Sequence, residues 1–230
     1  MENKARVLVT LLTWNRHDIL KETINSLFEN NGNLDILALD NGSTDSTCDL
    51  LESMNIETIK SPSNIGIFNG TSKLWLEADK RGYDFVINLQ DDFPCFRKIP
   101  INDMAKYLNE NQDVGFILLN NKNKLFKVGR KGKISVTKKS RKFNKFTKKK
   151  LKYKEWTKCG STNFIKFNHH FTFNPTFIRT NILQSIVLNN PKQREFGIME
   201  RYHNLSLLSA KTKKHYFRTV IRKRFNGWIH

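Results

Sequence analysis

Short apolar runs alternate with helical patterns along the first half of the chain, and this alternation constrains the fold most. The apolar runs are β-branched and continuous, as buried parallel strands are; they cover residues 5–13, 34–40, 56–60, 83–89 and 114–120. The helical patterns between them cover residues 17–30, 43–54, 69–82 and 101–112. Strands that alternate with helices imply right-handed crossovers and a mostly parallel sheet. We therefore expect an α/β protein, a single domain whose mostly parallel sheet is flanked by helices.

Polar residues stand at the ends of three of these predicted strands. Asn15 follows the first strand, Asp40 ends the second, and Asp91 and Asp92 follow the fourth. In open α/β sheets, ligands bind beyond the carboxyl ends of the strands. We therefore expect these residues to belong to one ligand site.

The two adjacent aspartates in VINLQDDF have two readings. Neighbouring ionised carboxylates repel each other, and turns collect aspartates because the side chain bonds nearby backbone. Alternatively, the pair binds a hard cation, because Mg²⁺ or Mn²⁺ is held by one or two carboxylates plus substrate phosphates. Asp40 has the same ambiguity, since Asp is also common in turns and helix caps. The residues alone leave both readings open.

The 230-residue chain has a net charge of +19 that is unevenly distributed. Residues 1–120 hold 11 Lys/Arg and 18 Asp/Glu, whereas residues 121–230 hold 29 Lys/Arg and 3 Asp/Glu. Such asymmetry indicates an anionic partner on the basic side. The segment 121–158 is dense in lysine with interleaved aromatic residues. Nucleic acid, an anionic membrane surface and an acidic glycan acceptor all fit that composition.

The cysteines and the hydropathy of the chain bear on the cellular compartment in which we expect the protein. Cys48, Cys95 and Cys159 are odd in number and show neither a disulfide framework nor zinc-ligand spacing. No apolar run approaches the ~20 residues of a membrane-spanning helix. The first apolar run lacks a small-residue cleavage site, so it favours a core strand over a signal peptide. We expect a cytoplasmic protein whose basic segment allows association with a membrane surface.

The second half is less regular. We expect a hairpin and basic loop over residues 127–158, an apolar segment at 161–167, and helices near 175–188 and 194–210.

The ordered motifs of the first half resemble the nucleotide-binding half of family 2 glycosyltransferases. The motifs are TWNRHDILKETINSL, LALDNGSTDST, SNIGIFNG and INLQDDF, over roughly residues 5–120. The resemblance implies the Rossmann-like, A-type nucleotide-sugar transferase fold. Residues 1–120 would be its nucleotide-sugar-binding half, and residues 121–230 the acceptor-side half of the same domain. The family's acidic metal motif more often begins with Asp or Glu, so Gln90 is a departure.

The resemblance also implies roles for individual residues. Asp92 would be the ligand of Mn²⁺ or Mg²⁺ and act in catalysis, because the cation stabilises charge on the leaving diphosphate. Asp91 would lie near the ribose or in the outer shell of the metal. The remaining nucleotide-binding residues would be Thr13, Asn15, Arg16, Asp40, Asn64 and Gly66. Of these, Arg16 could face phosphate.

An inverting transfer needs a base to take the proton of the acceptor hydroxyl. The second half offers three carboxylates, Glu155, Glu195 and Glu200. Glu155 lies in the lysine run, and Glu195 begins a predicted helix, where acids are favoured anyway. We predict Glu200 as the base, because it lies beside apolar residues in GIMER, which resembles the family's short acidic motif. A solvated pair of Glu200 with His203 is the alternative.

These features and the resemblance together predict a metal-dependent glycosyltransferase that moves a sugar from a nucleotide-diphosphate donor, a UDP-sugar, to a hydroxyl acceptor. Inversion at the transferred sugar is what the resemblance alone implies. The acceptor would be a glycan, a lipid-linked molecule or a protein, with anionic acceptors matching the basic half. The alternative is a basic binding protein for nucleic acid or an anionic surface, without catalysis. The acidic first half disfavours nucleic acid, and no nucleic-acid-binding module is visible. A sugar-1-phosphate nucleotidyltransferase would need a Gly-rich basic loop after the first strand, which this sequence lacks.

Overall fold

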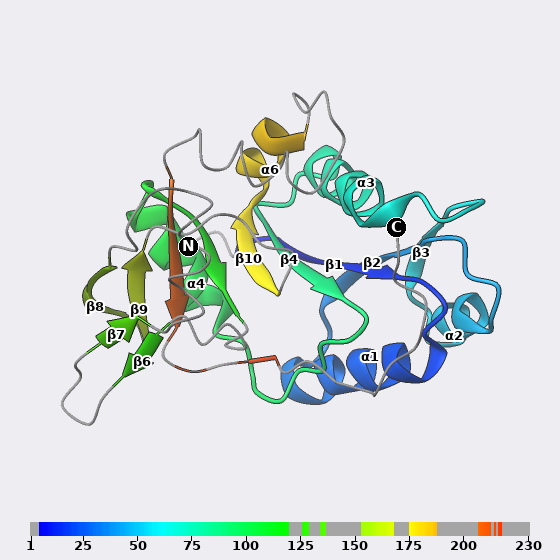
Figure 1. The fold of residues 1–230 in the computed structure, drawn as a ribbon, viewed down its shortest axis with the longest axis horizontal. Coiled ribbons are helices and arrows are strands. Elements are labelled where there is room, and N and C mark those ends of the chain that lie inside the picture. Colours follow the sequence, from blue (N-terminus) through cyan, green and yellow to red (C-terminus); the bar gives the residue numbers. More distant parts are fainter. Residues whose placement is uncertain are drawn as a thin grey trace.

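A nine-stranded sheet runs through the protein and carries helices on both faces (Figure 1). The computed structural model describes residues 5–119, 126–128, 134–136, 153–167, 175–187, 207–212, 214, 216 and 217. Its strands are β1 (Val7–Thr13), β2 (Asp35–Asp40), β3 (Glu57–Lys60), β4 (Phe85–Gln90), β5 (Val114–Leu118), β8 (Tyr153–Cys159), β9 (Thr162–Phe167), β10 (Thr176–Arg179) and β11 (Leu208–Thr212). Its helices are α1 (His17–Asn31), α2 (Thr47–Ser53), α3 (Gly66–Lys80), α4 (Ile101–Glu110) and α6 (Thr180–Val187).

The strand order is β3-β2-β1-β4-β10-β5-β11-β9-β8. The first four strands in this order are all parallel, as the alternating sequence pattern predicts. Beyond β4 the sheet is mixed: β10 is antiparallel to β4 and β5, β11 is parallel to β5, and β9 and β8 are antiparallel. The predicted single-domain α/β fold is confirmed, with parallel pairing concentrated in the first half of the chain.

Two predicted helices of the second half are wrong in part. Residues 176–179 form β10 and only residues 180–187 are helical. Residues 208–212 form β11, where the predicted helix was to end. Both strands pair on their two sides with strands distant in sequence, and such pairing overrides a local helical pattern. The predicted hairpin is present as β6 (Phe126–Val128) and β7 (Ile134–Val136).

Two apolar clusters cover the two faces of the sheet. Helices α1, α2 and α4 pack on one face and α3 and α6 on the other; in Figure 1, α1 and α2 lie below the sheet and α3 and α6 above it. Gly70 lets α3 approach β1 closely, because a Cβ atom there would lie 2.6 Å from a methyl carbon of Leu12. None of the helices described here is long and apolar enough to cross a membrane.

The register of the parallel strands brings their carboxyl ends to one edge. Thr13 at the end of β1 lies opposite Asp40 at the end of β2. On the other side of β1, Leu12 lies opposite Gln90, the last residue of β4. The loops that follow these three strands therefore start side by side.

Candidate active site

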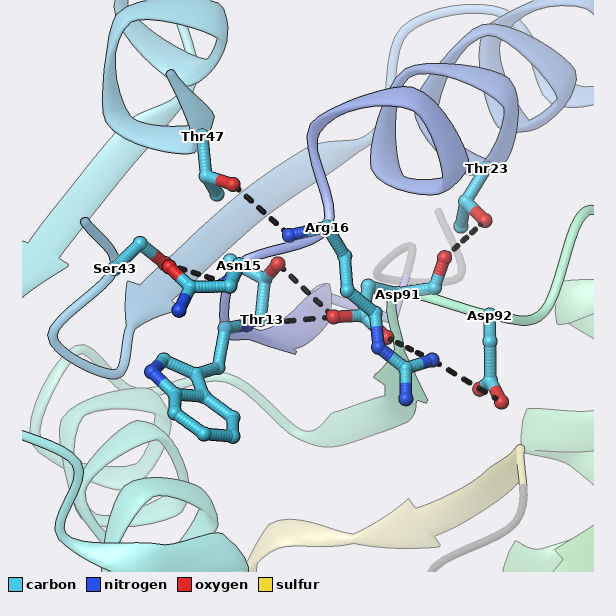
Figure 2. A network of polar contacts seen from close by, with 9 residues as sticks. Thr13, Asn15, Arg16, Thr23, Ser43, Thr47, Asp91 and Asp92 are labelled. Carbon is cyan, nitrogen blue, oxygen red and sulfur yellow. Dashed lines mark hydrogen bonds and ion pairs between the residues drawn. The ribbon is translucent and has the colours of Figure 1, made fainter. Parts of the chain in front are cut away.

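The aspartate pair follows β4, and the first aspartate turns toward β1. Its Oδ2 atom accepts hydrogen bonds from the Thr13 hydroxyl at 3.0 Å and the Trp14 amide at 3.4 Å. Its backbone carbonyl accepts a 2.6 Å bond from the hydroxyl of Thr23 on α1 (Figure 2). Asp91 is only 6% exposed. These contacts fix the position of Asp91 relative to the start of α1.

One guanidinium nitrogen lies between the two carboxylates, as Figure 2 shows. The Nη1 atom of Arg16 is 3.5 Å from Oδ1 of Asp91 and 3.7 Å from Oδ2 of Asp92. The side chains of Arg16 and Asp92 are 25% and 23% exposed. The repulsion expected between adjacent carboxylates is thus offset by a cation from the loop after β1.

Burial raises the pKa of the Asp91 carboxyl to about 6, and the neighbouring charge of Asp92 contributes to this rise. Arg16 and the hydrogen bonds from Thr13 and the Trp14 amide act in the opposite direction, but burial dominates. At neutral pH the Asp91 carboxyl, with a pKa of about 6, is therefore still mainly ionised.

The segment that carries Arg16 is tied to the loop after β2. Asn15 has a φ of 50°, in the left-handed region that Asn tolerates better than most residues. Its amide donates to the Ser43 hydroxyl at 2.8 Å, and its Oδ1 atom accepts from the Thr44 amide at 2.7 Å. The amide of Arg16 donates to the Thr47 hydroxyl at 3.1 Å. Asn15 therefore joins two loops, and its side chain does not cap α1.

The Asp40 carboxylate is 2% exposed and is used inside its own loop. Its Oδ2 atom accepts from the Ser43 amide at 3.1 Å and from the Cys48 thiol at 3.2 Å. Its Oδ1 atom is buried and has no hydrogen-bond partner among the residues that the structure describes. The turn reading of Asp40 is therefore confirmed, and a contact with nucleotide stays a prediction.

A pair of asparagines joins the loop after β2 to the loop before α3. Asn41 donates to Oδ1 of Asn64 at 2.9 Å and accepts from the Ile65 amide at 2.9 Å. The same Asn64 oxygen accepts from the Gly66 amide at 2.9 Å. Gly42, with a φ of 77°, allows the close approach, because a Cβ atom there would lie 2.6 Å from the carbonyl carbon of Ser63.

A pocket of about 250 Å³ lies where these loops meet. It is lined by Leu12, Thr13, Trp14, Arg16, Asn41, Ile67, Gln90, Asp91 and Asp92. Of the predicted site residues, Thr13, Arg16 and both aspartates line it, whereas Asn15, Asp40, Asn64 and Gly66 lie in the loops around it. The sequence reasoning missed Trp14 and Asn41. Their position, directly after a strand end and beside a predicted site residue, was the signal available.

A larger cavity of about 1080 Å³ lies elsewhere, beside the amino end of β1, the start of α4 and the turn between β8 and β9. It contains no predicted site residue. We place the site in the smaller pocket, because the paired carboxylates, the guanidinium and three strand-end loops converge only there among the described segments.

The chain matches the family model described as glycosyl transferase family 2 over residues 9–171. The chain belongs to glycosyl transferase family 2. No curated protein sequence matches it.

Solved structures share this family fold. S. aureus TarS 1-349 in complex with UDP-GlcNAc matches with a TM-score of 0.61 and 17% identity, over 97% of this chain and 62% of that one. A further crystal structure of S. aureus TarS 1-349 matches with a TM-score of 0.58 and 16% identity, over 92% of this chain and 59% of that one. The family 2 chain thus spans about three fifths of the TarS structures that it matches. At this identity the likeness establishes the fold, a nucleotide-sugar glycosyltransferase fold, and the resemblance read from the sequence is confirmed.

Two predictions for the second half of this family 2 domain lie outside the described residues. These are Glu200 as the base and the lysines of residues 137–152 as an anionic contact. The side chains of Glu155 and Glu195, the other two carboxylates of that half, are also outside.

Proposed function

We propose that this family 2 protein is a divalent-cation-dependent, inverting glycosyltransferase that transfers a sugar from a UDP-sugar to a hydroxyl acceptor. One observation carries the proposal. Asp91 and Asp92 lie at the carboxyl end of β4, in a pocket that they share with Arg16 and the loop after β2. Carboxylates and a guanidinium at one strand edge are the groups needed to bind a cation and a diphosphate together.

The donor set fits Mg²⁺ or Mn²⁺. The part of the chain that the structure describes contains no group of three or more His, Cys, Asp or Glu able to hold a metal. Two carboxylates are therefore what the site offers, and these hard cations take one or two carboxylates plus phosphate and water. Asp92 is the proposed ligand, because its side chain is 23% exposed whereas that of Asp91 is 9% exposed. The cation, when bound, supplies counter-charge to the leaving diphosphate.

The loops around the pocket would hold the nucleotide. Thr13 and Arg16 line the pocket itself. Asn15, Asp40, Asn64 and Gly66 would contribute by holding the walls in place, through bonds between the loops after β1 and β2 and before α3. The S. aureus TarS structures in complex with UDP-GlcNAc and with UDP support uridine as the first nucleotide to test.

Glu200 is the proposed base, and the half formed by residues 121–230 is the proposed acceptor side. The base would take the acceptor's proton on the face opposite the leaving diphosphate, which gives inversion. The excess of 29 Lys/Arg over 3 Asp/Glu in this half supports an anionic acceptor or a peripheral contact with an anionic membrane.

A thermal-shift panel of nucleoside diphosphates and nucleotide sugars, each with and without Mn²⁺, tests the proposal. A ligand that binds the folded state raises the melting temperature by mass action. We expect a uridine nucleotide with Mn²⁺ to give the largest shift. A shift with short oligonucleotides and none with any nucleotide would instead support the basic binding protein.

A further inference from the structure

The Arg16 guanidinium is close enough to neutralise both aspartates, yet neither distance is that of a tight hydrogen bond. The distances of 3.5 and 3.7 Å exceed the ~2.7–2.9 Å of charge-assisted bonds. These two contacts are therefore electrostatic and lack the directional geometry of a bidentate Arg–carboxylate pair. A cation held in this way is easier to replace than one in a bidentate pair.

The guanidinium stands where an incoming metal ion must approach. Asp92 is partly exposed, but its Oδ1 atom is buried. The oxygen open to a cation is therefore Oδ2, the one that faces Arg16. Mg²⁺ binds oxygen ligands at ~2.0–2.1 Å, so a cation at this oxygen would lie close to the positive charge of Arg16. The metal ion and the guanidinium therefore repel each other at this oxygen.

The backbone of Arg16 is held by hydrogen bonds, and its side chain is partly exposed in the pocket. Its amide is bonded to the Thr47 hydroxyl, and the preceding Asn15 is bonded to Ser43 and Thr44. The side chain is 25% exposed and lines the pocket. Rotation about the side-chain bonds of Arg16 would move its guanidinium away from the aspartates and leave the backbone hydrogen bonds of the loop in place. A guanidinium fork matches phosphate oxygens as well as carboxylates.

We infer that Arg16 is the resident counter-ion of the Asp91–Asp92 pair and exchanges with the divalent cation when a nucleoside diphosphate binds. The cation takes Oδ2 of Asp92, and Arg16 moves from the carboxylates to the diphosphate. This inference rests on the proposed function and adds a coupling to it. Metal alone meets the positive charge of Arg16 at the carboxylates, whereas a diphosphate bound with the metal offers that guanidinium an anionic partner. Metal and nucleotide therefore bind cooperatively, and the coupling is reciprocal.

Direct titration of Mn²⁺, followed by the electron paramagnetic resonance signal of the free ion, tests the exchange. The titration is run on the parent protein, R16Q and R16K, with no nucleotide and with saturating UDP. K21Q is the matched control. Lys21 is an exposed residue of α1, and its substitution by Gln removes the same positive charge as R16Q. Circular dichroism checks the fold of each variant.

We expect UDP to tighten Mn²⁺ binding to the parent by at least about fivefold, the lower end of typical coupling. R16Q should bind Mn²⁺ alone about fivefold more tightly than the parent and should lose most of the UDP effect. R16K retains a charge without the fork, so it should bind Mn²⁺ alone as weakly as the parent and recover only part of the coupling. K21Q should match the parent in both.

The inference is overturned if R16Q binds Mn²⁺ alone no more tightly than the parent, or if its coupling with UDP is unchanged. Those outcomes leave the proposed function intact, because the parent still binds Mn²⁺ and UDP together. A parent protein that binds neither overturns the proposed function and the exchange together.

Discussion

The two strands beside β1, β2 and β4, both carry aspartate at their carboxyl ends, yet the carboxylates at these two ends have different partners. At the end of β2, the Asp40 carboxylate accepts bonds from the Ser43 amide of the following loop and from the Cys48 thiol at the start of α2. After β4, Asp91 and Asp92 face the guanidinium of Arg16 in an open pocket. The first carboxylate builds the wall of the site, and the second pair faces the space within it.

This difference shows that the partners of a strand-end carboxylate determine whether it has a structural role or is available to a ligand. A backbone amide within the same turn is a permanent partner that a ligand does not replace. A long cationic side chain held at 3.5 to 3.7 Å is a partner that another cation can replace. The predictions below break or sharpen this distinction, in decreasing order of expected effect.

The largest effect is expected at Glu200, which tests whether the aspartate pair acts on the donor alone. Glu200→Gln should reduce transfer by ~10²–10⁴-fold, the usual value of a positioned base. UDP binding should stay unchanged, because the base meets the acceptor. Steady-state transfer assays and UDP calorimetry measure the two quantities. Transfer at the parent rate would move the base elsewhere, with Glu195 as the next candidate.

Asp92→Asn keeps the shape of the side chain and removes its charge. Turnover should fall by ~10²–10³-fold, because the leaving diphosphate loses the cation that stabilises its charge. The matched control is Asp18→Asn on α1, whose side chain is 76% exposed and lies outside the pocket. If the Asp92→Asn enzyme were fully active, the segment after β4 would have only a structural role, like the turn after β2.

Gly42→Ala tests whether the loop after β2 acts as a rigid wall. The change adds a Cβ atom 2.6 Å from the Ser63 backbone at a φ of 77°. It should lower the free energy of unfolding by about 2 kcal/mol and weaken UDP binding several-fold. Gly32→Ala is the control, because its φ of 68° is also positive but no atom lies within 4 Å. Urea denaturation and calorimetry should show destabilisation in both variants and weaker UDP binding only in Gly42→Ala.

The smallest effect is expected at the Cys48 thiol, which reports on the environment of Asp40. Burial, together with the hydrogen bond and the charge of Asp40, raises the pKa of Cys48 to about 11. Asp40→Asn removes that charge, so the pKa should fall and a larger fraction of thiolate should be present at pH 8. Alkylation of Cys48 by iodoacetamide, followed by mass spectrometry, should therefore become faster. An unchanged rate would mean that Asp40 does not influence the thiol as the structure implies.

The sequence predicted the parts of this molecule that local pattern determines. Buried β-branched runs and helical stripes located the parallel strands, and the convergence of their carboxyl ends predicted that Asp91 and Asp92 belong to one ligand site. The family resemblance added Thr13 and Arg16, and all four residues line one pocket. The sequence did not predict that β10 inserts between β4 and β5. That insertion depends on pairing between residues 58 to 94 positions apart, which leaves no periodic pattern in the four-residue strand itself.

The direction of the side chains in the loops after the strands was the other feature that the sequence did not predict. Asp40 and Asn64 are predicted nucleotide-binding residues, and that prediction is not tested by their hydrogen bonds: Asp40 accepts from its own loop, and Asn64 accepts from Asn41 of the loop after β2 and from Gly66. Asn41 was not expected to contribute, yet it bridges two loops and lines the pocket. Which neighbour of a strand end turns inward depends on loop contacts between distant segments, and spacing in the sequence does not report these.

UDP calorimetry on the parent protein and Asp92→Asn, each with Mn²⁺ and with a chelator, tests the central claim most directly. The claim is that the segment after β4 binds a cation together with the nucleotide. Mn²⁺ should tighten UDP binding to the parent by at least about fivefold, and chelation should remove the gain. Asp92→Asn should bind UDP with the same low affinity in both conditions. Equal binding of UDP to the parent with and without the chelator would contradict the claim.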